Sequence, residues 1–240
     1  MSFKSLSTVS ILWLAAITLC LAVGNVSAST ISKTNSAINY TSQTHEQPNL
    51  KSVNGRIEVG DGLKVGDVKT TNGRIRLGDE VVAKDVRTTN GSIAVGRGGT
   101  LDSVRSTNGS LSIEGGKVKG DVRTTNGAIR IEDESVIEGN VISANGHIEL
   151  DEAKVKDNVE LSNGRMDLRR AEIGGDVVIH ERRGSSWFGR HKKPVVVIGA
   201  ETVVKGDIIA RQEIELFVHE SAKVGNIVGA EAQTFSGRNP

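Results

Sequence analysis

The segment Val68-Lys69-Thr70-Thr71-Asn72-Gly73-Arg74-Ile75-Arg76-Leu77 recurs with variations through most of this 240-residue chain. Its Asn-Gly pair is found seven times, at steps of 18, 18, 18, 18, 19 and 18 residues. A repeat of fixed length is typical of architectures in which successive units stack on one another. The pairs are Asn54-Gly55, Asn72-Gly73, Asn90-Gly91, Asn108-Gly109, Asn126-Gly127, Asn145-Gly146 and Asn163-Gly164.

Hydrophobic residues keep the same phase in every repeat. One column stands four residues before each Asn, and two more stand three and five residues after it, alternating with polar residues as in β-strands. A fourth column is displaced by one residue in some repeats, so we expect about three short strands per repeat. The four columns are Leu50, Val68, Val86, Val104, Val122, Val141 and Val159; Ile57, Ile75, Ile93, Leu111, Ile129, Ile148 and Met166; Val59, Leu77, Val95, Ile113, Ile131, Leu150 and Leu168; and Val65, Val82, Leu101, Val118, Ile137, Val155 and Ile173.

Asn-Gly is also the preferred sequence of a two-residue hairpin turn, in which both central residues need positive φ. Antiparallel hairpins, however, do not require like residues to line up from unit to unit. The unbroken phase favours parallel coils stacked about 4.8 Å apart. The sequence therefore predicts an all-β fold, a single-stranded parallel β-helix (β-solenoid) of roughly nine coils with about 18 residues each. Gly would serve the tight corner, and the Asn side chains would bond to one another between coils or to the corner backbone.

Residues 1–28 are predicted to be a signal peptide. Lys4 precedes an apolar stretch, residues 11–23, that is short for a membrane span, and Val26-Ser27-Ala28 matches a cleavage site. The mature chain would then begin at Ser29, in the periplasm or at the surface of a bacterium; an uncleaved N-terminal anchor is the alternative. Leu19 before Cys20, the single cysteine, argues against lipid attachment.

The rest of the chain divides into three segments, the second of which carries an inserted loop. Residues 29–49 are polar and predict a flexible leader, residues 50–229 form the solenoid domain, and residues 230–240 form a polar C-terminal tail. Residues 181–194 interrupt the repeat and are expected to be a loop inserted at the corner where Asn-Gly stands in earlier coils. No amphipathic cap is evident over the last coil. The net charge of +1 gives no general attraction to nucleic acid.

A Gly-Asp-Val-like step recurs at the end of many repeats, as in Gly66-Asp67-Val68, Gly120-Asp121-Val122 and Gly206-Asp207-Ile208. With the segment from Ala200 to Ile208, it resembles the bactofilins, the polymer-forming bacterial cytoskeletal β-helices. The Thr-Asn-Gly-x-Ile-x-Leu units look more like bacterial adhesins built from short β-strand repeats. The resemblance covers roughly residues 50–229 and implies an envelope protein that self-assembles or attaches to surfaces. The export signal departs from the usual cytosolic bactofilin, which argues against a cytoskeletal role.

Charged residues form two outward columns. Since like charges at strand spacing repel, we expect a solvated charge ladder in which each column relieves the repulsion in the other; a calcium site or a groove for a polyanion is the alternative. The acidic column is Asp67, Asp85, Asp121 and Asp176, interrupted by Ser103, Asn140 and Asn158, and the basic column two residues on is Lys69, Arg87, Arg105 and Arg123.

Threonines form two neighbouring columns, of which strand alternation lets only one face outward. The basic column lies on the same strand, so a flat uncharged ice-binding face is not expected, and we attribute the threonines to β-propensity and ladder bonding. The columns are Thr70, Thr88 and Thr124, and Thr71, Thr89, Thr107 and Thr125.

The inserted loop is the candidate binding element. Exposed aromatic residues among basic ones suit an anionic glycan, a membrane surface or an envelope protein; the alternative is that the aromatic rings fold back over an edge of the solenoid. The candidate residues are Arg182, Arg183, Trp187, Phe188, Arg190, His191, Lys192 and Lys193.

No catalytic residue, metal ligand or cofactor-binding residue is predicted. The histidines share no metal-ligand spacing, and the glycines fall at repeat corners rather than in a phosphate loop. We therefore expect a non-enzymatic exported envelope protein, a rigid scaffold for adhesion or for assembly with itself, end to end or laterally. The alternative is a polysaccharide-active enzyme that uses the charged ladder as its substrate groove, in which Asp121 and Arg123 would act.

Overall fold

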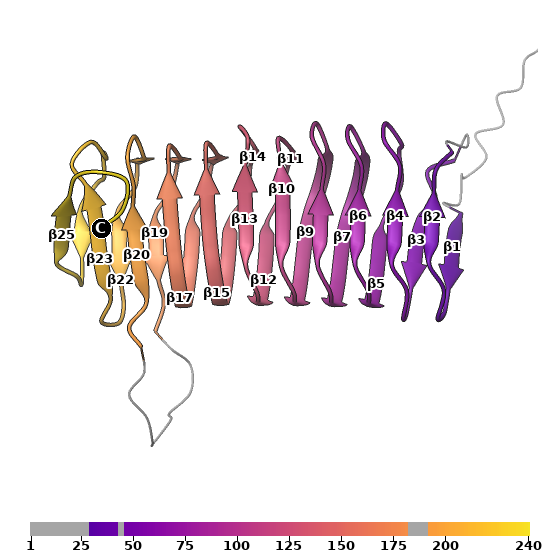
Figure 1. The fold of residues 1–240 in the computed structure, drawn as a ribbon, viewed down its shortest axis with the longest axis horizontal. Helices are drawn as coiled ribbons and strands as arrows, with labels where there is room; N and C mark the ends of the chain where they lie inside the picture. The colour runs from indigo at the N-terminus through magenta and orange to yellow at the C-terminus, as the bar shows by residue number, and fades with distance from the viewer. Residues whose placement is uncertain (1–28, 43–45, 182–191) are drawn as a thin grey trace, which may run out of the picture.

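The computed structural model describes residues 29–42, 46–181 and 192–240, and it confirms the predicted parallel β-solenoid. Coils about 18 residues apart stack into an elongated body of about 11 turns, with β1 and β25 at opposite ends of the stack (Figure 1). The pairings between its strands are parallel. No helix able to cross a membrane is found among these residues.

The strands are β1 (Thr30–Lys33), β2 (Ile38–Tyr40), β3 (Asn49–Ser52), β4 (Ile57–Val59), β5 (Val68–Asn72), β6 (Ile75–Leu77), β7 (Val82–Asn90), β8 (Ile93–Val95), β9 (Thr100–Asn108), β10 (Leu111–Glu114), β11 (Lys117–Val118), β12 (Val122–Asn126), β13 (Ile129–Glu132), β14 (Val136–Ile137), β15 (Val141–Asp151), β16 (Lys154–Val155), β17 (Val159–Arg169), β18 (Glu172–Ile173), β19 (Val177–Ile179), β20 (Val195–Ile198), β21 (Val203–Val204), β22 (Ile208–Ala210), β23 (Glu215–His219), β24 (Ile227–Val228) and β25 (Ala232–Phe235).

Each coil contributes to three stacks of strands, which we call faces. The first face contains β3, β5, β12, β19, β22 and β24 and the parts of β7, β9, β15 and β17 that pair with them. The second face contains β4, β6, β8, β10, β13, β20, β23 and β25 and the remaining halves of β15 and β17. The third face contains the short strands β11, β14, β16, β18 and β21. Long strands such as β15 run around a corner and so belong to two faces.

The predicted apolar columns form the core between the three faces. Val68, Ile75 and Leu77, for example, are buried and pair with their equivalents Val86, Ile93 and Val95 in the next coil.

One position was assigned wrongly to the fourth column, because Val82 is 38% exposed and Ala83 takes its place opposite Leu101. The one-residue displacement of that column accounts for the error.

Two predicted boundaries are wrong. Residues 30–33 and 38–40, expected in a flexible leader, form β1 and β2, which pair with β3 and β4. Ile38 and Tyr40 are buried, so this polar segment still supplies the alternating apolar side chains that a coil needs. At the other end, residues 232–235, expected in the tail, form β25 on β23. The solenoid therefore extends beyond residues 50–229 at both ends.

The Asn-Gly corners are closed by a ladder of side-chain amides, as predicted. Each Asn Nδ2 donates to the Asn Oδ1 of the preceding coil. The bonds are Asn54 to Asn35 (2.7 Å), Asn72 to Asn54 (2.8 Å), Asn90 to Asn72 (2.7 Å), Asn108 to Asn90 (2.8 Å), Asn126 to Asn108 (2.8 Å), Asn145 to Asn126 (3.0 Å) and Asn163 to Asn145 (3.0 Å).

Glycine is required at these corners mainly because the coils approach closely. A Cβ at Gly109 would overlap the carbonyl oxygen of Gly91, and Gly91 stands in the same relation to Gly73. The described Asn residues of the repeated pairs do not adopt positive φ, so these corners are not hairpin turns.

The insertion lies where it was predicted. β19 pairs with the first half of β17 and β20 with its second half, so the chain leaves and rejoins the coil on either side of the Asn163-Gly164 corner. Residues 182–191 lie outside the described part of the chain.

Candidate functional site

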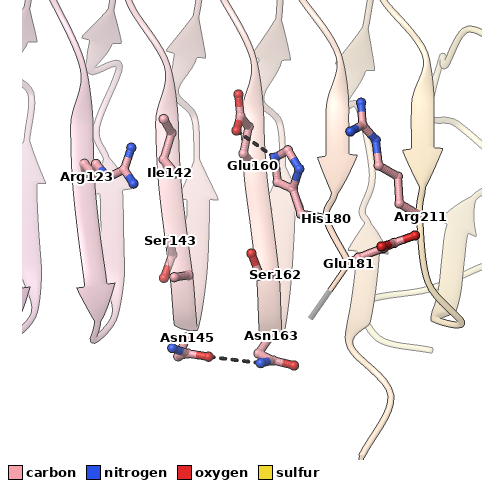
Figure 2. A pocket seen from close by; sticks show the side chains of 11 residues that line it. Arg123, Ile142, Ser143, Asn145, Glu160, Ser162, Asn163, His180, Glu181 and Arg211 are labelled. Atoms are coloured by element: carbon pink, nitrogen blue, oxygen red, sulfur yellow. Dashed lines mark hydrogen bonds and ion pairs between the residues drawn. The ribbon is translucent and has the colours of Figure 1, made fainter. Parts of the chain in front are cut away.

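Two adjoining hollows lie on the first face. The larger, about 610 Å³, is next to the insertion (Figure 2). The smaller, about 470 Å³, extends from it along the stack, and Arg123 lines both. We call them the corner groove and the ladder groove. The corner groove is lined by Arg123, Ile142, Ser143, Ala144, Asn145, Glu160, Ser162, Asn163, His180, Glu181 and Arg211, and the ladder groove by Arg87, Thr88, Thr89, Arg105, Ser106, Thr107, Asp121, Arg123 and Thr125.

The corner groove contains one close pair of functional side chains. His180 Nε2 lies 2.8 Å from Glu160 Oε2, and both residues are partly exposed. The backbone beneath them is fixed by Gln212, whose Nε2 donates to the carbonyl oxygens of Ser162 (2.6 Å) and His180 (2.7 Å). Imidazole next to carboxylate can bind a polar ligand or move a proton.

The ladder groove follows the predicted basic column, which the structure extends by one residue to Lys51. Parallel pairing places Lys51, Lys69, Arg87, Arg105 and Arg123 in register on successive coils. On later coils the same column continues with Ile142, Glu160 and Val178. The column therefore changes from cationic to mixed at the point where the two grooves meet.

The acidic column helps to hold successive coils together through hydrogen bonds to the backbone. A side-chain oxygen of Asp or Asn in one coil accepts the amide N–H of the equivalent residue in the next, for example Asn140 N to Asp121 Oδ1 (3.0 Å) and Asp207 N to Asp176 Oδ1 (2.9 Å). A Cβ on the preceding residue, such as Gly139 or Gly206, would collide with that oxygen. The recurrent Gly-Asp step is therefore a coil-stacking motif.

The acidic column neutralises the basic one only in part. Lys69 Nζ lies 2.6 Å from Asp67 Oδ2, and this hydrogen bond holds the pKa of Asp67 below its ordinary value. Arg105 reaches Asp121 at 4.0 Å. Within the described residues, Lys51, Arg87 and Arg123 make no ion pair within 4.0 Å. The predicted mutual relief of the two columns is thus incomplete.

On the third face each carboxylate of the stack lies between two lysines. Glu138 lies between Lys156 (2.9 Å) and Lys117 (3.1 Å), and Glu172 between Lys205 (2.6 Å) and Lys154 (2.9 Å). Hydrogen bonds from these lysines lower the pKa of both carboxyl groups. Here opposite charges alternate along the stack.

The second face carries a compact ion-pair network. Asp167 is only 4% exposed and accepts two hydrogen bonds of 2.7 Å from the Arg165 guanidinium, which raises the pKa of Arg165. His147 Nε2 lies 3.4 Å from Asp167, and Arg130 pairs with Glu149 at 2.7 Å. No group of His, Cys, Asp and Glu suited to a metal ion occurs among the residues with described positions. The carboxylates are engaged by cations, so this network has the character of a structural brace.

The threonine columns divide as strand alternation requires. Thr70, Thr88 and Thr124 are buried, and their hydroxyls donate to the corner glycine carbonyls at 3.1 to 3.2 Å. The column Thr71, Thr89, Thr107 and Thr125 faces outward beside the cations. The buried hydroxyl column ends at Ser143, whose Oγ has no hydrogen-bond partner in the described structure.

The structure describes only part of the predicted binding loop. Lys192 and Lys193 are exposed, and Lys193 Nζ lies 2.9 Å from Glu213 Oε2. Arg182, Arg183, Trp187, Phe188, Arg190 and His191 lie outside the described residues.

The sequence interpretation missed the corner groove, because its residues come from five coils and share no motif. The end of the basic column after Arg123 is the signal that could have located it.

Comparisons with protein-family models, with curated proteins and with solved structures gave no match. The structure supports the solenoid part of the resemblance noted in the sequence. Nothing in the comparisons bears on the bactofilin-like or adhesin type.

Proposed function

We propose that this chain is a non-enzymatic, exported scaffold of the bacterial envelope that assembles end to end, coil on coil. The observation that carries the proposal is the uncovered core at the C-terminal end of the stack. In the central coils the core columns are buried, as at Val104, Leu111 and Ile131. In the last coils the core residues Val218, Val224 and Ile227 are only partly buried.

The C-terminal tail leaves this end open. Arg169 Nη2 donates to Asn239 Oδ1 at 3.3 Å, so the tail turns back along the side of the stack. β25 pairs with β23 and with no further strand of the described chain. An open strand edge with partly exposed apolar residues is a template for pairing with another chain.

A second copy of the chain fits this edge by register. Its first coil would place Ile31, Ile38 and Tyr40 in the same columns as Ile227, Ala232 and Thr234, because these residues occupy equivalent positions along the pairings. At the position of Ala232 in earlier coils, Ile57 and Ile75 donate their amide N–H groups to the following coil. The N–H groups of Ala232 and, two residues on, Thr234 therefore face the open edge.

Export and surface attachment rest on the predicted signal peptide and on the basic-aromatic composition of the insertion. In this proposal the scaffold acts in the periplasm or at the cell surface. The insertion would contact an anionic glycan, a membrane surface or an envelope protein.

The test is assembly of the mature chain, beginning at Ser29, followed by sedimentation velocity and electron microscopy over increasing concentration. The Thr234→Pro variant should remain monomeric, because Pro removes the outward N–H of an edge strand and leaves the pairing with β23 intact. Ser236→Pro, just beyond β25, should assemble as the parent chain does. A parent chain that stays monomeric at all concentrations, or a Thr234→Pro variant that still forms filaments, would refute end-to-end assembly.

The alternative function is a polysaccharide-active enzyme, favoured by one observation. The His180–Glu160 pair lies in the corner groove and could transfer a proton to or from a bound sugar. A screen of acidic polysaccharides for lyase and hydrolase products tests it. Turnover that is lost in Glu160→Gln would replace the scaffold proposal with this one.

A further inference from the structure

We propose that the ladder groove binds a linear acidic polysaccharide, with the polymer lying along the solenoid axis and its carboxylates on the column of Lys51, Lys69, Arg87, Arg105 and Arg123. This site is separate from the inserted loop. It goes beyond the proposed function, because assembly through the end coils needs no ligand on the first face.

The register of the cations is the first argument. The residues occupy one column on successive coils, so their side chains begin about 4.8 Å apart and the column spans roughly 19 Å. A straight, evenly spaced row of cations matches a ligand whose charges also repeat along a line. A compact anion would engage only one or two of them.

The cost of this arrangement is the second argument. Like charges directly opposite on paired strands destabilise a sheet. The same solenoid avoids this on its third face, where Glu138 and Glu172 each lie between two lysines. On the first face, Arg87 and Arg123 have no carboxylate within 4.0 Å among the described residues, and Asp121 is also committed to the amide of Asn140. An external polyanion would supply the missing countercharge.

Neighbouring side chains favour a sugar polymer. The outward threonines Thr71, Thr89, Thr107 and Thr125 run parallel to the cations and offer hydroxyls that both donate and accept hydrogen bonds. Residues 46–126 contain no Phe, Tyr, Trp or His, whereas proteins that bind single-stranded nucleic acid stack bases on aromatic rings. A surface that binds membranes would combine its cations with apolar residues that enter the lipid. Beside this column the exposed large apolar residues are few, such as Val53.

The ladder groove adjoins the corner groove at Arg123. Arg123 lines both, and beyond it the first face presents Ser162, His180 and Arg211. A polymer bound on the ladder can therefore continue into the wider hollow beside the insertion.

The experiment measures binding of sodium polygalacturonate to the mature chain in the Thr234→Pro background. Neutral dextran, an oligothymidylate and phosphatidylglycerol–phosphatidylcholine vesicles serve as comparison ligands. The ladder variant is Arg87→Gln/Arg105→Gln/Arg123→Gln. The control is Arg56→Gln/Arg74→Gln/Arg76→Gln, which removes the same charge from exposed arginines of the second face. Circular dichroism melting verifies that each variant is folded.

The ladder variant should bind polygalacturonate at least about tenfold more weakly, while the control changes affinity by less than about threefold, since only the ladder contacts are charge-assisted. Affinity should fall steeply with added salt, and more steeply in the control than in the ladder variant.

Equal losses in both variants, or no binding of polygalacturonate by the parent chain, would overturn the proposal. Stronger binding of the oligothymidylate or of the vesicles would also overturn it. Each binding measurement is independent of assembly. The binding result can therefore be interpreted even if the chain does not assemble, and the assembly result can be interpreted even if the polysaccharide does not bind.

Discussion

The central coils, residues 68–168, and the C-terminal coils, from residue 177 onward, are built on the same columns but held in different ways. In the central coils each corner combines an Asn-to-Asn bond with a glycine packed on the carbonyl of the previous coil, as at Asn108 and Gly109. The C-terminal coils lack the repeated pair. There Gln212 reaches across the corner to two carbonyl oxygens.

The two regions also differ in coverage. Ile131 and Leu150 have a coil on each side and are fully buried, whereas Val224 and Ile227 are only partly buried. The repeat therefore sets the spacing of the coils, while the burial of a core side chain depends on a neighbouring coil on each side. A solenoid without a cap therefore has a stable interior and an end that gains from any further coil.

The largest effect is expected at a corner glycine. Gly109→Ala should destabilise the protein by about 3 kcal/mol, because the new Cβ overlaps the Gly91 carbonyl and coils on both sides prevent relief. Gly225→Ala meets the Gly206 carbonyl in the same way but lies near the open end, so it should cost less than half as much. Denaturant unfolding measures both changes.

Gly60→Ala is the control for this pair. Its Cβ would make only an ordinary contact, 3.5 Å from Leu63 Cδ1, so stability should change by about 0.5 kcal/mol or less. If Gly225→Ala proved as costly as Gly109→Ala, the proposed difference between the two regions would be wrong.

The second prediction compares the two ways of closing a corner. Asn108→Ala removes its bonds to Asn90 and Asn126, and Gln212→Ala removes two bonds to backbone carbonyls. Each should cost about 1–2 kcal/mol, because an intramolecular hydrogen bond contributes about 1 kcal/mol net. Thermal unfolding measures the losses. Thr107→Ala, next to the Asn108 amide bonds, is the control and should cost about 0.5 kcal/mol or less. If Thr107→Ala proved as costly as Asn108→Ala, the stability loss of Asn108→Ala could not be assigned to its amide bonds.

The third prediction concerns the end of the buried hydroxyl column. Thr88 Oγ1 donates to the Gly73 carbonyl at 3.2 Å, so Thr88→Val should destabilise the protein by about 1 kcal/mol. Ser143 Oγ is buried without a partner in the described structure, so Ser143→Ala should be neutral or stabilise by up to about 1 kcal/mol. Urea denaturation of both variants provides the comparison. Two changes of the same sign and size would contradict the bonding assigned to this column.

The smallest effect is the pH dependence contributed by Asp67. The hydrogen bond from Lys69 lowers the pKa of Asp67 from its ordinary value of 3.8. The ion pair therefore stabilises the fold fully above pH 3.8, and this contribution is lost as the pH falls through the folded-state pKa. Asp67→Asn should reduce the loss of unfolding free energy on acidification through that range by about 0.5 kcal/mol or less, because the pair is partly exposed. Unfolding curves between acidic and neutral pH measure it, and an unchanged profile would exclude the pair as a source of acid sensitivity.

The parallel solenoid, its strands and the position of the insertion could be predicted from the sequence. Identical residues at a fixed spacing indicate which positions lie next to each other on adjacent coils. Asn72 and Asn90 are seen to be partners from the repeat alone, and the structure joins them at 2.7 Å. The first and last coils were not predicted, because their sequences are mostly polar. Residues 29–49 contain few apolar residues, yet Ile31, Ile38 and Tyr40 contribute one layer of the core.

The candidate site was predictable only in part. The basic column follows directly from the repeat, but its incomplete neutralisation depends on rotamers and on the use of Asp121 as a backbone acceptor. The His180–Glu160 pair could not be predicted from the repeat, because the register pairs Glu160 with Val178 and His180 stands two residues further along the strand.

The side-chain amides of the corner ladder all point the same way. From Asn54 to Asn163 each Nδ2 donates toward the N-terminal end, and from Asn35 to Asn145 each Oδ1 accepts from the C-terminal side. The solenoid is therefore polar along its axis, and its two ends are chemically different. Any fibre grown by continuing the coils would inherit this direction, and it would lengthen at unequal rates from its two tips.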